Sequence, residues 1–168
     1  MARTFSRLLR RHQVLNDIHR IPINKRTIWQ RLTFKARASA FTSAVGKRYA
    51  AFIPVGTRLS PTIRFGHAFN GVHIAGNARI GEHVLIMQNV PIGANMGHAR
   101  DTEAPVIGNN VFIGANACII GRCVIGDGAK IGAGVVLVNA TIPAGAVIVN
   151  NSAYDLTNDR SVYSRSRS

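Results

Sequence analysis

The chain has 168 residues, of which 46% are hydrophobic and 17% charged, so we expect one folded domain with a short extension rather than a disordered chain. No apolar run approaches the roughly 20 residues of a membrane-spanning helix, and arginines interrupt the first apolar stretch, so we expect no secretory signal. Residues 1–64 carry +13 of the formal net charge of +14, whereas residues 65–150 are neutral. We therefore expect a cytoplasmic protein with a neutral body and a basic arm.

The basic arm contains two stretches with helical spacing of apolar residues, over residues 3–20 and 26–51, separated by Pro22. Arginines and lysines lie between the apolar positions, so both stretches predict basic amphipathic helices. One interpretation is a cap over the open end of the domain that follows. Another is peripheral contact of residues 1–50 with an anionic membrane, at its inner face. Nucleic-acid binding is disfavoured because no known reading motif accompanies the charge.

The body of the chain is built on a repeat of six residues. Isoleucine recurs with this spacing in two runs, and glycine follows most of these isoleucines. A small or β-branched residue stands four positions after each isoleucine, so the unit is Ile-Gly-x-x-Val/Ala-x. The isoleucines are Ile74, Ile80, Ile86, Ile92, Ile107, Ile113, Ile119, Ile125 and Ile131, and Leu137 extends the phase.

A period of six fits neither an α-helix nor a simple hairpin ladder, but it fits short strands wound into a solenoid. In such a solenoid the isoleucines stack in the interior and each coil contacts only its neighbours. Three hexads make a coil of about 18 residues. Ten recognisable hexads therefore predict a little over three coils, with irregular flanks before residue 74 and after residue 142.

The repeats resemble those of the hexapeptide-repeat acyltransferases, whose fold is a left-handed parallel β-helix. The resemblance covers about residues 55–153 and includes Ala104-Pro-Val-Ile-Gly-Asn-Asn-Val-Phe-Ile-Gly-Ala-Asn-Ala and Pro143-Ala-Gly-Ala-Val-Ile-Val-Asn-Asn-Ser-Ala. It implies a mainly β fold, a homotrimer with sites between subunits, and acetyl-CoA as co-substrate. We expect a helical segment over residues 1–54, a β-helix domain over residues 55–153 and a disordered tail over residues 154–168.

One interruption of the repeat predicts a loop. Ile92 and Ile107 are fifteen residues apart, so nine extra residues are expelled near Ala94–Ala104. Insertions at the corners of a solenoid commonly line a binding face. This loop concentrates polar residues on an otherwise plain body, and we expect Arg100 and Asp101 in it to contact the acceptor substrate.

His67 is the leading candidate for a catalytic residue. It lies in Gly66-His67-Ala68-Phe69-Asn70-Gly71, which resembles the Asp-His-Ala-Thr-Gly motif of serine acetyltransferases and the Gly-His-x-x-Gly motif of saccharide O-acetyltransferases. In these families the histidine is the general base. An alcohol is too weakly acidic to attack a thioester at neutral pH, and a neutral imidazole can accept its proton. We expect Asn70 in this motif to contact the acceptor.

Two departures from the serine acetyltransferase pattern favour a sugar hydroxyl over serine as acceptor. Gly66 stands where those enzymes have the aspartate that pairs with the catalytic histidine, and Ala104 stands where they have a second histidine. His98, earlier in the loop, is a candidate to replace that second histidine. Transfer is expected to be direct, within a complex of enzyme, acetyl-CoA and acceptor.

By motif, Ala115, Lys130 and Ala133 match positions that line the coenzyme A groove of the family. Small residues there leave backbone groups open to the amides of the pantetheine arm, and Lys130 is a candidate partner for a phosphate. Cys118 and Cys123 have no activating base nearby in sequence, so we interpret both as structural.

Three readings of function remain open at this point. The leading hypothesis is an acetyl-CoA-dependent O-acetyltransferase that acts on a saccharide, and the first alternative is serine O-acetylation in cysteine biosynthesis. The second alternative is a non-catalytic solenoid that binds an anionic surface through the arm. A zinc carbonic anhydrase of the same fold is excluded, because Ala115 and Ile120 occupy its ligand positions and no other metal-ligand spacing occurs.

Overall fold

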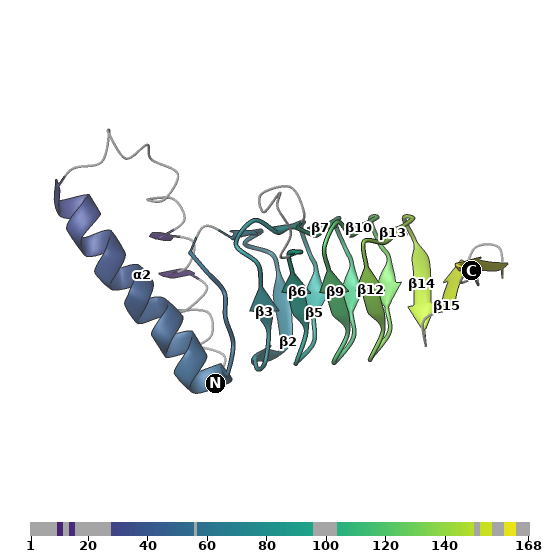
Figure 1. The fold of residues 1–168 in the computed structure, drawn as a ribbon, viewed down its shortest axis with the longest axis horizontal. Coiled ribbons are helices and arrows are strands. Elements are labelled where there is room, and N and C mark those ends of the chain that lie inside the picture. Colours follow the sequence, from purple (N-terminus) through teal and green to yellow (C-terminus); the bar gives the residue numbers. More distant parts are fainter. Residues whose placement is uncertain are drawn as a thin grey trace.

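Short strands recur in threes along the chain, and the computed structural model winds them into a three-sided parallel β-helix (Figure 1). The structure describes residues 10, 11, 14, 15, 28–55, 57–95, 104–149, 152–155 and 160–163. A single long helix, α2 (Ile28–Tyr49), precedes the strands and confirms the helix predicted over residues 26–51. The helix predicted over residues 3–20 lies mostly outside the described residues.

Each coil contributes one strand to each of three sheets, which form the sides of the prism. Sheet A comprises β3 (His73–Ile74), β6 (Pro91–Gly93), β9 (Cys118–Ile120) and β12 (Val136–Val138). Sheet B comprises β1 (Arg58–Leu59), β4 (Arg79–Ile80), β7 (Val106–Ile107), β10 (Val124–Ile125) and β13 (Thr141–Ile142). Sheet C comprises β2 (Arg64–Phe69), β5 (Leu85–Ile86), β8 (Phe112–Ile113), β11 (Lys130–Ile131), β14 (Ala146–Val149), β15 (Ser152–Asp155) and β16 (Arg160–Tyr163).

The interior of the prism is filled by the isoleucines of the repeat. In sheet C, for example, Ile86, Ile113, Ile131 and Ile148 follow one another in parallel register along the prism axis. Every isoleucine of the predicted set is at most 6% exposed, and the small residues four positions later are at most 1% exposed. The prediction of an interior isoleucine column at each side of a parallel solenoid is therefore confirmed.

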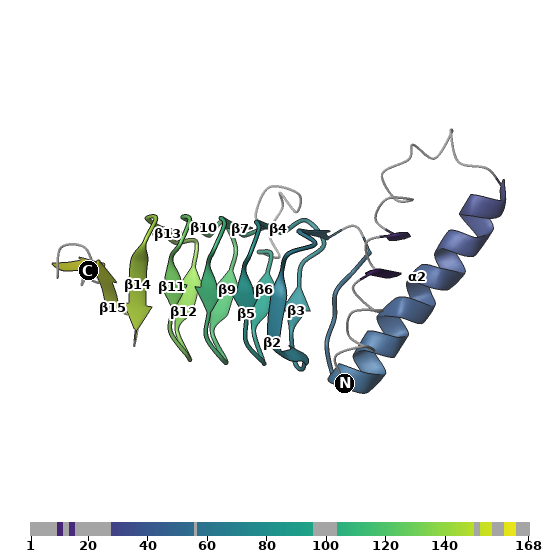
Figure 2. The ribbon, with the colours of Figure 1, turned by 180° about the vertical axis from the view of Figure 1, so that it is seen from behind.

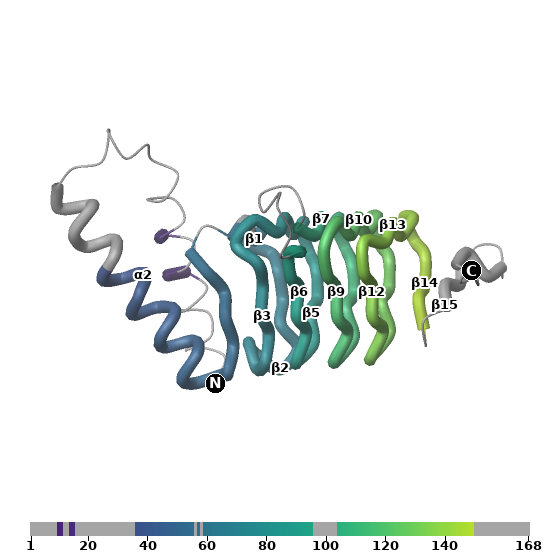
Figure 3. The backbone as a smooth tube through the Cα atoms, viewed as in Figure 1, coloured from purple at the N-terminus to yellow at the C-terminus, as the bar shows by residue number. Residues whose placement is uncertain are grey.

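The solenoid begins earlier and is longer than the repeat predicts. Strands β1–β3, β4–β6, β7–β9 and β10–β12 form four complete coils, and β13 and β14 begin a fifth (Figure 3). The first coil escapes the pattern because Leu59 and Phe65 occupy the positions that isoleucines fill in the next coil, in register with Ile80 and Ile86. The expectation of little more than three coils is wrong for this reason.

The nine-residue insertion lies where the spacing places it, between β6 and β7. Paired residues of successive coils differ by 18 in number, as for Cys118 and Val136, but by 27 across the insertion, as for Ile92 and Ile119. The coils before and after the insertion therefore keep the same register. Residues 96–103 of the loop lie outside the described residues.

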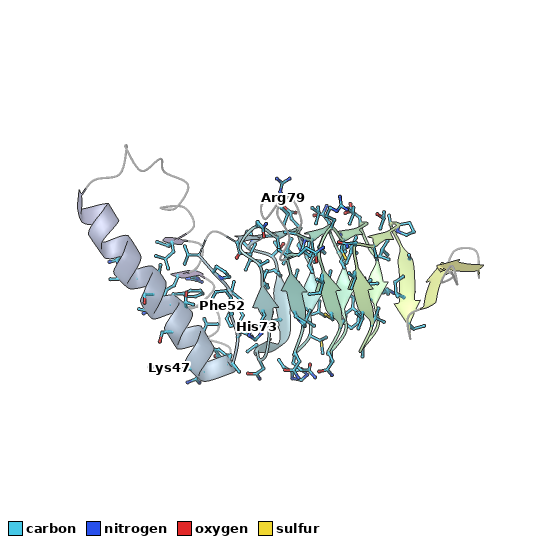
Figure 4. The ribbon with its side chains drawn as sticks, in the orientation of Figure 1. Lys47, Phe52, His73 and Arg79 are labelled. Carbon is cyan, nitrogen blue, oxygen red and sulfur yellow. The ribbon has the colours of Figure 1, made fainter. Side chains whose placement is uncertain are left out.

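Helix α2 covers the N-terminal end of the prism, as the cap interpretation predicts. Phe41 and Val45 of the helix are buried in the same apolar cluster as the solenoid interior. After the helix, Phe52 pairs with His73 of β3 and adds a first rung to sheet A, and the two residues lie close together in Figure 4. The apolar end of the first coil is thereby shielded from water.

The C-terminal strands differ in direction from the rest of sheet C. Strand β15 runs antiparallel to β14, and β16 runs antiparallel to β15, so the parallel coils give way to a meander at this end. Figure 2 shows strands β2, β5, β11 and β14 of sheet C along the prism. Within the described ranges, no helix is both long and apolar enough to cross a bilayer.

Candidate active site

The candidate base His67 lies where sheet C turns towards sheet A, at a position that recurs in each coil. Phe65 pairs with Ile86, and a Cβ added at Gly66 would collide with Met87 Sδ, so the register continues into the turn. The next pair in this register is His67 above Gln88. Because Ile86, Ile113 and Ile131 are also paired, Gln88 lies above Ala115, and Ala115 above Ala133. We call this column, His67, Gln88, Ala115 and Ala133, the corner column.

The residue after each member of the corner column has a left-handed backbone. These residues are Ala68, Asn89, Asn116 and Gly134, with φ between 55° and 68°. Asparagine and glycine adopt this conformation readily, whereas alanine does so at a cost of about 1–2 kcal/mol. The strained residue in the column is thus the one that follows the candidate base, and strain of this kind clusters at functional sites.

The side chain of His67 is exposed, as a base that meets an incoming hydroxyl must be. Its carbonyl oxygen accepts a hydrogen bond from the Asn70 backbone N–H at 3.4 Å, which closes the turn. Phe65 and Phe69, on either side of it in β2, point inward and contact each other with ring centroids 4.8 Å apart. The two buried rings anchor the strand, so the imidazole is presented outward from a rigid support.

Gln88, one coil below His67, is a polar residue that the sequence reading missed. Its side-chain oxygen Oε1 is buried and has no hydrogen-bond partner among the described residues. Its backbone carbonyl accepts a hydrogen bond from the Asn116 N–H at 3.0 Å, which ties the turn to the next coil. In the sequence Gln88 occupies a variable position of the hexad, and only the register shows that it lies beneath His67.

The structure brings together three of the predicted site residues. His67, Ala115 and Ala133 share the corner column, with Ala115 half-buried and Ala133 exposed. Asn70 is exposed in the turn that follows His67. Lys130 is exposed on the outer face of sheet C, three residues before Ala133, and so lies beside the column rather than in it.

The loop candidates His98, Arg100 and Asp101 lie outside the described residues, so their predicted roles remain predictions. Ala104, at the end of the insertion, is half-buried and leads into the buried Pro105. No group of three or more histidine, cysteine or acidic side chains that could hold a metal ion occurs in the described part of the chain.

The two cysteines differ in environment. Cys123 is buried, its Sγ donates to the Ile120 carbonyl at 3.2 Å, and burial raises the pKa of its thiol above the ordinary range. Cys118 is half-buried on β9. A buried thiol with a raised pKa is a poor nucleophile, which supports a structural role for Cys123.

Comparison with known proteins places this fold in a family. Residues 104–139 match the family described as "Bacterial transferase hexapeptide (six repeats)". The chain is 32% identical over 125 residues to a serine acetyltransferase of Helicobacter pylori, and the match covers 71% of each chain.

Two solved structures have the same fold. A soybean serine acetyltransferase complexed with serine matches with a TM-score of 0.68 and 31% identity, over 92% of this chain and 56% of that one. A Brucella abortus serine acetyltransferase in complex with coenzyme A matches with a TM-score of 0.70 and 23% identity, over 91% of this chain and 53% of that one. The chain thus spans about half the length of these two structures. It belongs to the serine acetyltransferase family of hexapeptide-repeat, left-handed β-helix acyltransferases, for which acetyl-CoA is the co-substrate.

Proposed function

We propose that this protein transfers the acetyl group of acetyl-CoA to the hydroxyl of serine. The observation that carries the proposal is the position of His67 at the head of the corner column, above Ala115 and Ala133. Serine as acceptor is supported by the Helicobacter pylori relative and by the soybean structure, whose ligand is serine. These similarities favour serine over the saccharide acceptor that the departures at Gly66 and Ala104 predict.

In the proposed reaction His67 acts as general base. The serine hydroxyl oxygen attacks the thioester carbonyl carbon while an imidazole nitrogen of His67 accepts the hydroxyl proton. The tetrahedral intermediate then collapses and its carbon–sulfur bond breaks. The imidazolium returns the proton to the departing thiolate, so that O-acetylserine and coenzyme A leave and His67 is neutral again.

The corner column fits an extended pantetheine arm. Neighbouring coils are about 4.8 Å apart, so the column offers a straight path from His67 towards Ala133. The methyl side chains of Ala115 and Ala133 leave room beside the backbone for the amides of the arm. We place the thioester beside His67 and the remainder of coenzyme A down the column, with Lys130 available to a phosphate at the edge of sheet C.

We further propose that the protein is a homotrimer whose sites lie at the seams between subunits. Apolar side chains on two outer faces support this assembly: Val106 and Val124 on sheet B are 41% and 47% exposed, and Val138 on sheet A is 54% exposed. A neighbouring subunit that covers these faces would shield them from water. Sedimentation equilibrium checks the mass, and a monomer at micromolar concentration contradicts the assembly.

A saccharide hydroxyl is the second candidate acceptor, and one observation favours it. Gly66 places no carboxylate beside His67, where serine acetyltransferases have an aspartate. An acceptor without an ammonium group has less need of that negative charge. A sugar is also larger than serine, and the nine-residue insertion after β6 is where its specificity would be set.

The experiment that tests the proposal is an acceptor screen. The purified protein is incubated with acetyl-CoA and either L-serine, D-serine, sugar nucleotides or oligosaccharides, and release of the coenzyme A thiol is followed. We expect stereospecific turnover with L-serine and formation of O-acetylserine. Turnover with a sugar but not with L-serine establishes the second candidate. Lack of turnover with every acceptor, together with binding to anionic vesicles, favours the non-catalytic reading.

A further inference from the structure

Gln88 holds a buried acceptor at the place where a histidine base needs one. A neutral imidazole acts as a base through one ring nitrogen only if the other nitrogen carries the proton, and a fixed acceptor selects that tautomer. The residue before His67 is Gly66, which has no side chain to supply this acceptor. The buried Oε1 of Gln88 lies one coil below His67 and has no donor in the described part of the structure.

We propose that the Gln88 carboxamide is the positioning residue of His67: its oxygen accepts the ring N–H of the imidazole and leaves the other ring nitrogen free to act as base. This inference rests on the proposed role of His67. The coil spacing of about 4.8 Å is within reach of the flexible glutamine side chain. Hydrogen bonds of catalytic groups are often long in the free enzyme and shorten when substrate binds.

The buried position of the oxygen argues for a partner within the protein rather than a substrate group. A buried polar atom without a hydrogen bond costs about 1–3 kcal/mol, so it is retained where it has a role in another state of the molecule. The side chain is uncharged, so it can select the tautomer without the large rise in imidazole pKa that a carboxylate causes. The other titratable groups around this end of the corner are Arg64 on β2, His73 on β3, and Arg48 and Tyr49 at the end of α2.

The test compares Gln88→Met, which removes the acceptor at similar volume, and Gln88→Glu, which keeps the acceptor and adds charge, with the matched control Met87→Leu in the same turn. Long-range ¹⁵N–¹H NMR of the imidazole in the full-length protein without substrate reports the tautomer and the pKa of His67. We expect one dominant tautomer in the parent and in Met87→Leu, and a mixture in Gln88→Met. In Gln88→Glu we expect a rise in the His67 pKa of about 1 to 2 units.

Kinetics separates this inference from the proposed function. We expect kcat of Gln88→Met to fall by roughly 10- to 100-fold, with the KM for acetyl-CoA within about twofold of the parent. The same tautomer ratio and the same His67 pKa in all three variants would overturn the role of Gln88, whatever the acceptor. If the NMR changes occur but His67→Ala retains full activity, Gln88 positions His67 and the proposed base is wrong.

An independent observation concerns the basic arm. Arg10, Arg11 and Arg37 line a cavity of about 520 Å³ between the first described helical residues and α2. All three arginines are exposed, and none forms an ion pair with an acidic residue within the described part of the chain. The cavity also has an apolar lining that includes Val14, which is 55% exposed, and Phe41, which is 4% exposed.

We infer that this arginine cavity docks on the phosphates of an anionic phospholipid surface. The three guanidinium groups match phosphate oxygens in charge and geometry. An exposed valine beside them is suited to the glycerol and acyl region, which a nucleic-acid backbone or free phosphate does not offer. The charge of residues 1–64, +13, attracts the same surface over a longer range.

Sedimentation of the full chain with vesicles tests this inference. We expect binding to vesicles of phosphatidylcholine and phosphatidylglycerol but not to phosphatidylcholine alone, and weaker binding at high salt. The double variant Arg11→Gln/Arg37→Gln should bind roughly 20-fold more weakly, and Arg122→Gln on the solenoid should bind as the parent does.

Val14→Asp separates a lipid surface from other anions. It should weaken vesicle binding and leave the affinity for a duplex oligonucleotide or for inorganic phosphate within about twofold. Equal binding to both kinds of vesicle overturns the inference. So does binding to the oligonucleotide that is tighter than vesicle binding and insensitive to Val14→Asp.

Discussion

The ring of Tyr49 packs edge-on against that of Phe69, with 5.7 Å between the ring centroids. Tyr49 is the last residue of α2 and Phe69 the last residue of β2, the strand that carries His67. The Tyr49 carbonyl also accepts a hydrogen bond from the Gly71 N–H at 2.8 Å. The cap helix and the candidate active site are therefore fixed to each other.

Replacement of Tyr49 by alanine tests this contact. We expect the free energy of unfolding to fall by about 2–3 kcal/mol, because the change removes an aromatic pair and leaves space over Phe69. Tyr49→Phe keeps the ring, and Lys47→Ala alters an exposed residue of the same helix, so both should stay within about 0.5 kcal/mol of the parent. Urea denaturation followed by circular dichroism measures all three, and equal stability of Tyr49→Ala and Tyr49→Phe contradicts the contact.

The left-handed backbone of Ala68 gives a prediction of opposite sign. Ala68→Asn should raise the free energy of unfolding by about 1 kcal/mol, since asparagine adopts this conformation with less strain. Asn116 has the same conformation two coils away. Asn116→Ala should lower the stability by a similar amount. Thermal denaturation checks both variants, and a destabilised Ala68→Asn contradicts the assignment of strain to Ala68.

Much of this fold follows from the sequence because the repeat reports burial directly. Each isoleucine of the hexads is interior, so the spacing alone predicts the three sheets and the position of the insertion. The first coil could not be predicted in this way. Phe65 and Phe69 replace the isoleucine pattern there, because the end of the prism must also pack against Tyr49 of α2.

The candidate site is predictable only in part. The motif around His67 and the small residues Ala115 and Ala133 can be read from the chain, but their alignment depends on a register that skips the insertion. Gln88 cannot be found from its spacing, since its position in the hexad is variable. Its significance comes from the coil above it, 21 residues earlier in the chain, which the sequence does not place next to it.

A ladder of polar side chains at the corner between sheets B and C supplies another test. Asp127 Oδ1 accepts the backbone N–H of Asn109 at 2.7 Å, and Asn109 Oδ1 accepts the N–H of Glu82 at 2.8 Å. Asp127→Ala should lower the free energy of unfolding by about 1 kcal/mol, since it leaves a backbone donor without this acceptor. Asp127→Asn retains an oxygen at the same place and should cost less. Chemical denaturation distinguishes the two, and equal losses contradict the ladder.

The thiols should react at different rates. Burial raises the pKa of Cys123, so this thiol stays protonated in the folded protein at pH 8, while the half-buried Cys118 is more accessible. We expect a disulfide reagent to modify one thiol in the native protein and the second only on unfolding, and Cys118→Ser to remove the first. Modification of both thiols at one rate is the contrary result.

The same pKa shift predicts how stability depends on pH. A thiol whose pKa is higher in the folded state than in the unfolded state contributes stability that is fully present below about pH 8.5, the ordinary thiol value. This contribution is lost as the pH rises further, because the unfolded thiol ionises first. Cys123→Ala should therefore show a smaller loss of stability between pH 8 and pH 10 than the parent, as measured by denaturation at each pH.

The most direct test of acetyl transfer by this protein is the rate of coenzyme A release from acetyl-CoA, with L-serine as acceptor, in the parent and in His67→Ala. The account predicts that the variant keeps its fold and loses roughly 10²- to 10⁴-fold in kcat, the share that a general base contributes. His83→Ala, which changes another exposed histidine of the solenoid, should leave kcat unchanged. A folded His67→Ala variant with the parent's kcat would contradict the account.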